Sequence, residues 1–175
     1  MSGWMIETGY KYAKVASLAW AEGNLGSESE VNAALAVEIL LKSLLAEPVE
    51  NELTGTVAEQ FKITGKNPGH NLFELYKAIP ADLRSKLGLV RHVNTFNEKK
   101  DVFTTRRYSY EPRTEGTYDN TLLHLAAELI PKLVEHFIES GSTDPWLQIY
   151  KADPNLFLLP KGIGKFAFHP SGHQV

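Results

Sequence analysis

A basic and aromatic stretch is the first part of the sequence suited to chemistry. Two lysines at positions 99 and 100 precede the run Arg106-Arg107-Tyr108-Ser109-Tyr110-Glu111. Arginine presents a planar fork of donors that matches phosphate oxygens, and tyrosine rings can stack on bases. The run therefore gives a candidate RNA-binding patch of Arg106, Arg107, Tyr108, Tyr110 and Glu111. The alternative is that Arg107 pairs with Glu38 or Glu111 inside the fold while the tyrosines fill gaps in the packing.

A pair of charges interrupts the most apolar helical pattern of the chain, which covers residues 27–46. Glu38 and Lys42 are four residues apart in it. Two adjacent apolar stripes leave this segment without the polar half that a surface helix keeps, so we expect other helices to surround it. An unpaired charge buried there would be costly. We expect Glu38 to bind an arginine of the Arg106–Arg107 pair or a neighbouring tyrosine, and Lys42 to reach Glu38 or a solvent edge.

Other parts of the sequence do not fit the motifs of metal binding, phosphate binding or nucleophilic catalysis. His169 and His173 are four residues apart, but Pro170 and Gly172 disfavour a helical ligand pair, and no third ligand has matching spacing. Residues 161–165 read Lys-Gly-Ile-Gly-Lys, which lacks the glycine spacing and the Ser or Thr of a phosphate loop. We expect neither a metal nor a cofactor.

Composition restricts the class of protein. A length of 175 residues fits one domain, and the net charge of −3 predicts no general attraction to polyanions. The absence of cysteine excludes disulfides and thiolate catalysis. No uncharged apolar run approaches the roughly 18 residues that a membrane-spanning helix needs. We expect a soluble, cytoplasmic protein that does not contact a membrane.

Hydrophobic periodicity predicts an all-α protein, an up-and-down bundle of four to five helices over residues 1–142. Residues 47–69, rich in Gly and Pro, are expected to be a long connection with one helical turn near residues 57–61. Asn71 followed by Glu74 predicts a capped helix start. The predicted helices cover residues 2–22, 27–46, 71–79, 89 to about 107, and 121–139, with a further turn or two between 80 and 88.

The C-terminal segment, residues 143–175, is predicted to be extended, because its prolines and glycines interrupt any period. Residues 143–160 nevertheless carry aromatic and aliphatic side chains that disordered tails lack. We expect this part to pack on the bundle or on a partner protein.

Several segments together resemble the HEPN superfamily of small helical bundles, roughly over residues 5–140. The resemblance rests on residues 32–45, with Glu38 and Lys42 inside an apolar run; on Gly69-His70-Asn71-Leu72-Phe73-Glu74-Leu75; on Arg107-Tyr108-Ser109-Tyr110-Glu111; and on the long helix that follows. It implies a bundle that is frequently dimeric, used in bacterial and archaeal defence, toxin–antitoxin and RNA-processing systems. Many members are metal-independent ribonucleases whose site is an Arg, a polar residue and a His shortly after the Arg.

The chain departs from that motif. Arg107 stands about where the resemblance places the arginine, yet the residues after it, as far as Thr114, include no histidine, and Arg91 has no correctly spaced one. His70 would have to supply the imidazole, if the fold brought it beside Arg107; its other role is to turn the chain and cap the next helix. The candidate catalytic set is therefore Arg107, His70 and Glu38, and the candidate binding set adds Arg106, Tyr108, Tyr110, Glu111 and Lys42.

The sequence supports three hypotheses. The first is a non-catalytic or weakly catalytic HEPN-like homodimer that binds RNA, a nucleotide or a protein partner. The second is a metal-independent endoribonuclease with a rearranged Arg/His site. The third is a structural interaction module that docks on another protein through residues 143–160.

Overall fold

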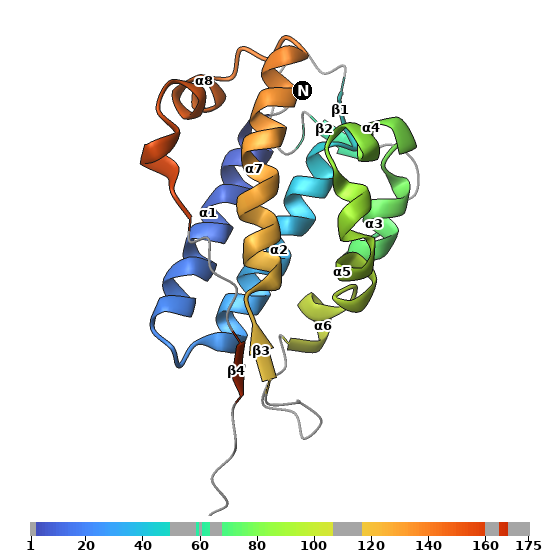
Figure 1. The fold of residues 1–175 in the computed structure, drawn as a ribbon. Helices are drawn as coiled ribbons and strands as arrows, with labels where there is room; N and C mark the ends of the chain where they lie inside the picture. The colour runs from blue at the N-terminus through green and yellow to red at the C-terminus, as the bar shows by residue number, and fades with distance from the viewer. Residues whose placement is uncertain are drawn as a thin grey trace, which may run out of the picture.

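Three long helices form the centre of the protein, whose computed structural model describes residues 3–49, 59, 61–63, 68–106, 117–159 and 165–167. They are α1 (Gly3–Ala21), α2 (Gly26–Ser43) and α7 (Thr121–Glu139), and each contacts the other two. Figure 1 shows short helices beside α2 on one side of this centre and α8 on the other. The predicted all-α bundle is therefore confirmed.

Helix α2 is buried on nearly all sides, as its pattern predicts. Val37, Leu40 and Leu41 are fully buried, and Glu28 alone among the residues of α2 is exposed. The helix ends at Ser43, three residues before the predicted end, because Ala46 begins a strand. Despite this apolar character, no helix within the described ranges has the length and hydropathy needed to cross a membrane.

The contact between α1 and α2 depends on a glycine. A Cβ atom added to Gly9 would lie 2.9 Å from both Cγ and Cδ2 of Leu40, whose side chain is fully buried. Carbon atoms do not approach one another so closely without displacement, so any side chain at position 9 would force the two helices or Leu40 to move. The sequence therefore places a glycine where the side chain of Leu40 leaves no room for a Cβ atom.

The short helices are α3 (Leu72–Ala78), α4 (Ala81–Lys86), α5 (Val93–Glu98) and α6 (Val102–Arg106), with the 3₁₀ helix η2 (Leu89–His92) between α4 and α5. Asn71 caps α3 as predicted, because its side-chain oxygen accepts a hydrogen bond from Glu74 N at 3.0 Å. The helix predicted from residue 89 to about 107 is thus divided into three pieces, and its last described residue is Arg106.

Two short antiparallel pairs of strands were not predicted. Strand β1 (Ala46–Pro48) pairs with β2 (Phe61–Ile63) inside the segment expected to be an irregular connection, and β3 (Thr117–Asp119) pairs with β4 (Lys165–Ala167). Strands of three residues are too short to show an alternating pattern, so periodicity could not reveal them. Phe61, the last residue of the expected helical turn at residues 57–61, belongs to β2, and most of the expected turn lies outside the described residues.

The C-terminal segment is not extended throughout. Helix α8 (Pro145–Ala152) begins at Asp144, whose carboxylate accepts hydrogen bonds from two amides of the first turn, and the 3₁₀ helix η3 (Pro154–Phe157) follows. Asp144 and Pro145 together are a strong signal for the start of a helix, but the helix that follows is only two turns long. Leu147 is fully buried, and Tyr10 of α1 contacts the ring of Phe157. The segment from 145 to 157 therefore lies on the bundle.

We predict that Gly9→Ala lowers the free energy of unfolding by about 1 to 3 kcal/mol, although alanine is the better helix former. Urea denaturation followed by circular dichroism measures the change. In a Leu40→Ala background the added methyl group has room, so the same substitution should be neutral or stabilising. Leu18→Ala, which alters a side chain 60% exposed on the same helix, should change stability by less than about 0.5 kcal/mol. Equal losses in both backgrounds would contradict the close contact.

Candidate functional site

Glu38, Lys42 and His70 lie together beside α2. Nδ1 of His70 is 2.9 Å from Oε2 of Glu38, and Nζ of Lys42 donates to Oε1 of Glu38 at 2.7 Å. The Glu38 side chain is 5% exposed, whereas that of His70 is 51% exposed. Both oxygens of the buried carboxylate thus have a partner, and one of those partners is open to solvent.

Local sequence sets the position of His70. Gly69 has a φ of +67°, which is favourable for glycine and strained for other residues, so the chain can turn sharply just before the histidine. Asn71 then starts α3, and its Nδ2 donates to Asp101 Oδ1 at 3.2 Å. The amide of Leu72 also donates to the carbonyl of Lys100 at 3.1 Å. These contacts hold the start of α3 against the turn between α5 and α6.

An aromatic ring of α6 supports the imidazole. The ring centroids of His70 and Phe103 are 4.4 Å apart with an interplanar angle of 34°. Because Glu38 fixes one edge of the imidazole and Phe103 covers one face, rotation of the ring is restricted at both its χ angles. The histidine is therefore held in one orientation although half of its surface is open.

This arrangement is suited to proton transfer. If Nδ1 carries the proton, its N–H donates a hydrogen bond to Glu38. The lone pair of Nε2 then lies on the opposite edge of the ring, away from the carboxylate. A buried carboxylate that fixes the tautomer of a histidine is a common feature of general-base sites. Within the described ranges, no group of three His, Asp or Glu side chains is arranged to hold a metal ion.

The predicted site residues are only partly brought together. The structure joins Glu38, Lys42 and His70, but it pairs Arg106 with Glu30 rather than with Glu38. Arg106 is therefore not the arginine that binds Glu38, whereas Lys42 reaches Glu38 as expected, and His70 takes the other oxygen of that carboxylate. A contact of Glu38 with Arg107 or a neighbouring tyrosine stays a prediction. The remaining predicted residues, Arg107, Tyr108, Tyr110 and Glu111, lie outside the described residues.

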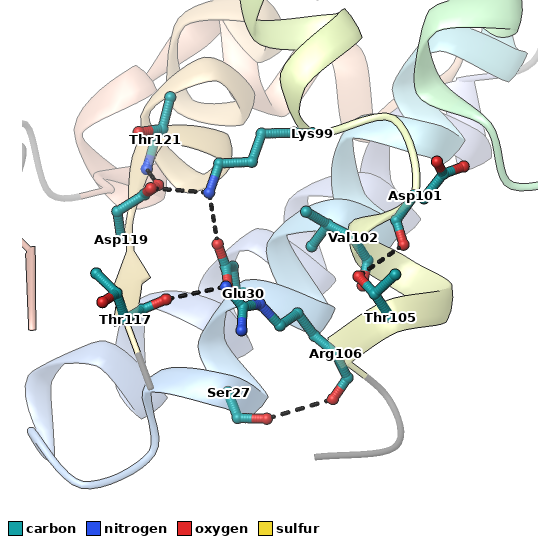
Figure 2. A network of polar contacts seen from close by, with 10 residues as sticks. All are labelled: Ser27, Glu30, Lys99, Asp101, Val102, Thr105, Arg106, Thr117, Asp119 and Thr121. Carbon is teal, nitrogen blue, oxygen red and sulfur yellow. Dashed lines mark hydrogen bonds and ion pairs between the residues drawn. The ribbon is translucent and has the colours of Figure 1, made fainter. Parts of the chain in front are cut away.

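A second polar network surrounds Glu30, whose side chain is 1% exposed (Figure 2). Nζ of Lys99 donates to Glu30 Oε1 at 2.7 Å and to Asp119 Oδ2 at 2.8 Å. Nε of Arg106 lies 3.0 Å from Glu30 Oε2 without hydrogen-bond geometry, so this contact is an ion pair only. The guanidinium also donates from Nη2 to the carbonyl of Thr117 at 2.9 Å. The network therefore joins α2, α5, α6 and β3.

The sequence carries no clear signal for this network. Acidic residues in the first turns of a helix are usual, because they complement the positive end of the helix dipole, so Glu30 does not stand out. The basic and aromatic neighbours of Arg106 favour a surface patch instead. In the structure its guanidinium is 5.1 Å from the centre of the Tyr118 ring and its side chain is 16% exposed. Arg106 is thus a structural residue of the described fold.

Burial and pairing act against each other within the network. Burial alone would lower the pKa of Lys99, but hydrogen bonds to Asp119 and Glu30 outweigh it and raise that pKa. Burial alone would raise the pKa of Asp119, but hydrogen bonds from Lys99 and Thr121 outweigh it and lower that pKa. Both groups therefore stay charged over a wider pH range than they would in water.

A third cluster lies on the polar face of α7. Glu128 pairs with Arg91 and accepts a hydrogen bond from Lys132 Nζ at 2.7 Å, and His92 Nε2 is 3.3 Å from its carboxylate. Burial lowers the pKa of His92, and the charges of Arg91 and Lys132 lower it further. The cluster forms because α7 and η2 lie close together in space, which sequence spacing cannot show.

We predict that Glu30→Ala lowers the free energy of unfolding by about 3 kcal/mol, because it leaves two largely buried cations without their shared carboxylate. Urea denaturation at pH 7 measures the loss. The matched control is Glu139→Ala, which removes a carboxylate from an exposed pair with Lys86 and should cost less than about 1 kcal/mol. Similar losses for both variants would show that the buried network contributes no more than a surface pair.

We also predict that the stability difference between the wild type and Lys99→Met depends on pH in two directions. The raised pKa of Lys99 contributes stability that is present below about pH 10.4, its unfolded value, and is lost as pH rises through the folded pKa. The lowered pKa of Asp119 contributes stability that is present above about pH 3.9 and is lost as pH falls through the folded pKa. Urea denaturation across this range should show the difference shrinking at both ends. A difference independent of pH would contradict the charge pairing.

Glu38 and His70 form the described arrangement best suited to chemistry, because one partner is buried and the other is open to solvent. Function has to be inferred from the chemistry of such side chains. No protein-family model matches the chain, and neither a curated protein nor a solved structure matches it.

Proposed function

We propose that this protein is a metal-independent endoribonuclease of the HEPN type in which His70 transfers protons and Glu38 orients it. The hydrogen bond between buried Glu38 and half-exposed His70 carries the proposal. It favours the ribonuclease hypothesis over the purely binding hypothesis, because a binding surface does not need an oriented imidazole. The pairing of Arg106 with Glu30 points the same way, since it occupies one of the two arginines on which the binding hypothesis rests.

The reaction that fits an oriented imidazole is internal transesterification of RNA. Nε2 of His70 takes the proton of a ribose 2′-hydroxyl, and the 2′-oxygen attacks the neighbouring phosphorus. The bond from phosphorus to the 5′-oxygen breaks, and the imidazolium returns its proton to that oxygen. The products are a 2′,3′-cyclic phosphate and a 5′-hydroxyl end. DNA lacks the 2′-hydroxyl and cannot react in this way.

Glu38 has a positioning role in this scheme. Its carboxylate keeps the proton on Nδ1, which leaves Nε2 free as the base, and it stabilises the imidazolium after proton transfer. Lys42 holds the other oxygen of the same carboxylate at 2.7 Å and so fixes its direction. Phe103 keeps the ring plane in place. Each of these three side chains acts through His70 and would not touch the RNA.

A cation for the reacting phosphate is the role assigned to Arg107. It follows directly on Arg106, the last residue of α6, and α6 carries the Phe103 that packs on His70. A guanidinium would bind the phosphate oxygens and stabilise the charge that develops on them. In this proposal Tyr108, Tyr110 and Glu111 belong to the substrate-binding part of the site, and the resemblance to HEPN proteins suggests that a homodimer in a defence or toxin–antitoxin system is the active form.

A protein-interaction role is the second candidate, and one observation favours it. The side chains of Ile149, Leu156 and Leu158 are 53%, 67% and 58% exposed, although they belong to a segment that otherwise packs on the bundle. Large apolar side chains that stay exposed on a packed segment are candidates for contact with another protein. Substituting these three side chains tests this role and leaves the fully buried Leu147 in place.

We predict that the purified protein cleaves single-stranded RNA in the presence of a chelator and leaves 2′,3′-cyclic phosphate ends. His70→Ala should slow cleavage by at least about 10²-fold, as expected for loss of a general base. Arg107→Ala should also abolish most activity, and Glu38→Gln should lower the rate while the fold is retained. End-labelled RNA on denaturing gels measures the rates, and circular dichroism checks folding.

His92→Ala is the matched control, because His92 is likewise within reach of a glutamate but lies in the separate cluster on α7. It should cleave at the wild-type rate. Cleavage that survives His70→Ala would exclude His70 as the base. Salt-sensitive RNA binding without any cleavage, weakened by Arg107→Ala, would instead support the purely binding hypothesis.

A further inference from the structure

Four exposed side chains form a stripe along α1. They are Lys11, Val15, Leu18 and Glu22, and the amide of Glu22 donates to the carbonyl of Leu18, so the helical path continues to Glu22. At about 100° per residue, the four positions fall within about 60° of one another around the helix axis. The valine and leucine side chains are 48% and 60% exposed. Figure 1 shows α1 at the edge of the bundle, so the stripe faces outward.

The exposed apolar surface is wider than Val15 and Leu18 alone. Tyr12, on the same helix, is 36% exposed. Leu158 adjoins α1, because Nζ of Lys14 donates to its carbonyl at 3.4 Å, and its side chain is 58% exposed. Single exposed apolar side chains are ordinary, but apolar side chains that gather on one face indicate contact with another protein.

The spacing of the stripe is the same in both directions. The intervals between its four positions are 4, 3 and 4 residues. Alternating intervals of three and four residues form the seam along which two helices pack. Because the order of intervals is symmetrical, the stripe fits a second, antiparallel copy of itself. In that pair Val15 meets Leu18 of the partner subunit, and Leu18 meets Val15 of the partner subunit.

The charges at the two ends of the stripe select the antiparallel direction. In an antiparallel pair Lys11 faces Glu22 of the partner subunit, whereas a parallel pair would bring two lysines together at one end and two glutamates at the other. Nζ of Lys11 is 2.7 Å from Glu7, but the lysine side chain is 68% exposed and can meet a second carboxylate. Glu22 is exposed and forms no ion pair within the described ranges.

We propose that two copies of this chain associate through this stripe, with their α1 helices antiparallel and a two-fold axis between Val15 and Leu18. A two-fold interface uses the same patch on both copies, so the patch must complement itself. The stripe meets this requirement in both its apolar and its charged positions, which a different partner protein would not demand. An interface of this kind lies at the small end of specific interfaces, below roughly 1,200 Å², so the dimer is weak and reversible.

This assembly does not involve the Glu38–His70 site. Leu40 of α2 packs against Gly9 of α1. Glu38 is two residues before Leu40, which places it on the opposite side of α2, where it contacts His70. Helix α2 therefore lies between α1 and His70, and the two His70 side chains of the proposed dimer would lie on its outer sides. The inference does not rest on the ribonuclease proposal.

Sedimentation velocity of the full chain at low salt tests the association. The fraction of dimer should rise with protein concentration, with a Kd of about 100 µM or tighter. Leu18→Gln should weaken the dimer at least about tenfold, because it removes two apolar side chains from the centre of the interface. Val90→Gln is the matched control, since Val90 is 51% exposed on η2, and it should leave the Kd unchanged. Circular dichroism shows whether the variants are folded.

Exchanging the two charges tests the antiparallel direction. Lys11→Glu and Glu22→Lys each place like charges at both ends of the interface, so each variant alone should dimerise about tenfold more weakly. An equal mixture of the two single variants should form a mixed dimer with nearly the wild-type Kd, because every end pair is then of opposite charge. The chain that carries both substitutions should also regain nearly the wild-type Kd.

Three results would overturn the proposal. They are a chain that stays monomeric up to about 500 µM, five times the expected Kd, a dimer that Leu18→Gln does not weaken, and a charge exchange that restores no affinity in the mixture or in the double variant. If Leu18→Gln fails to fold, the charge exchange still decides the question. RNA cleavage is not a readout of these measurements, so failure of the ribonuclease proposal and failure of this one are distinguished.

Discussion

Glu30 and Glu38 bring two negative charges into the interior of the bundle, and the positions of the cations and donors that meet them shape the structure around α2. A buried carboxylate without partners would be unstable, so each must be met by side chains from other parts of the chain. Glu38 takes Lys42 from its own helix and His70 from the start of α3. Glu30 is met by Lys99, which directly follows α5, and by Arg106, the last residue of α6. The short helices are thereby attached to α2 by charge as well as by apolar contact.

The two carboxylates differ in whether one of their partners stays exposed to solvent. Around Glu30 both cationic side chains are largely buried, 17% and 16% exposed, and their donors are directed at protein atoms. Around Glu38 one partner is a histidine with half its surface in solvent. The same physical requirement, a partner for a buried charge, produces a closed network at one level of α2 and an accessible imidazole at another. This contrast is the reason for assigning chemistry to His70 rather than to Lys99 or Arg106.

The sequence was informative where one pattern extends over many residues. The apolar positions of α2 and α7 predicted helices because each pattern repeats over several turns, and the Asn71 cap was visible because Asn71 and Glu74 are three residues apart. It was uninformative where contacts join distant segments. No short-range pattern shows that Glu38 contacts His70 or that Arg106 contacts Glu30. Strands of three residues, such as β1 and β3, are too short to show a period. The charged partner of a buried group is decided by packing, which sequence spacing does not show.

The contact between Arg106 and the carbonyl of Thr117 has a consequence for how the chain can vary. It joins the two ends of the interval 107–116, and Glu30 and Tyr118 hold the same guanidinium in place. The entropy cost of closing such an interval grows only slowly with its length, by about 0.6 kcal/mol for each doubling. Insertions or changes of composition between these ends should therefore be tolerated by the bundle. The interior of the bundle can therefore stay fixed while the sequence of the stretch that carries Arg107, Tyr108 and Tyr110 changes.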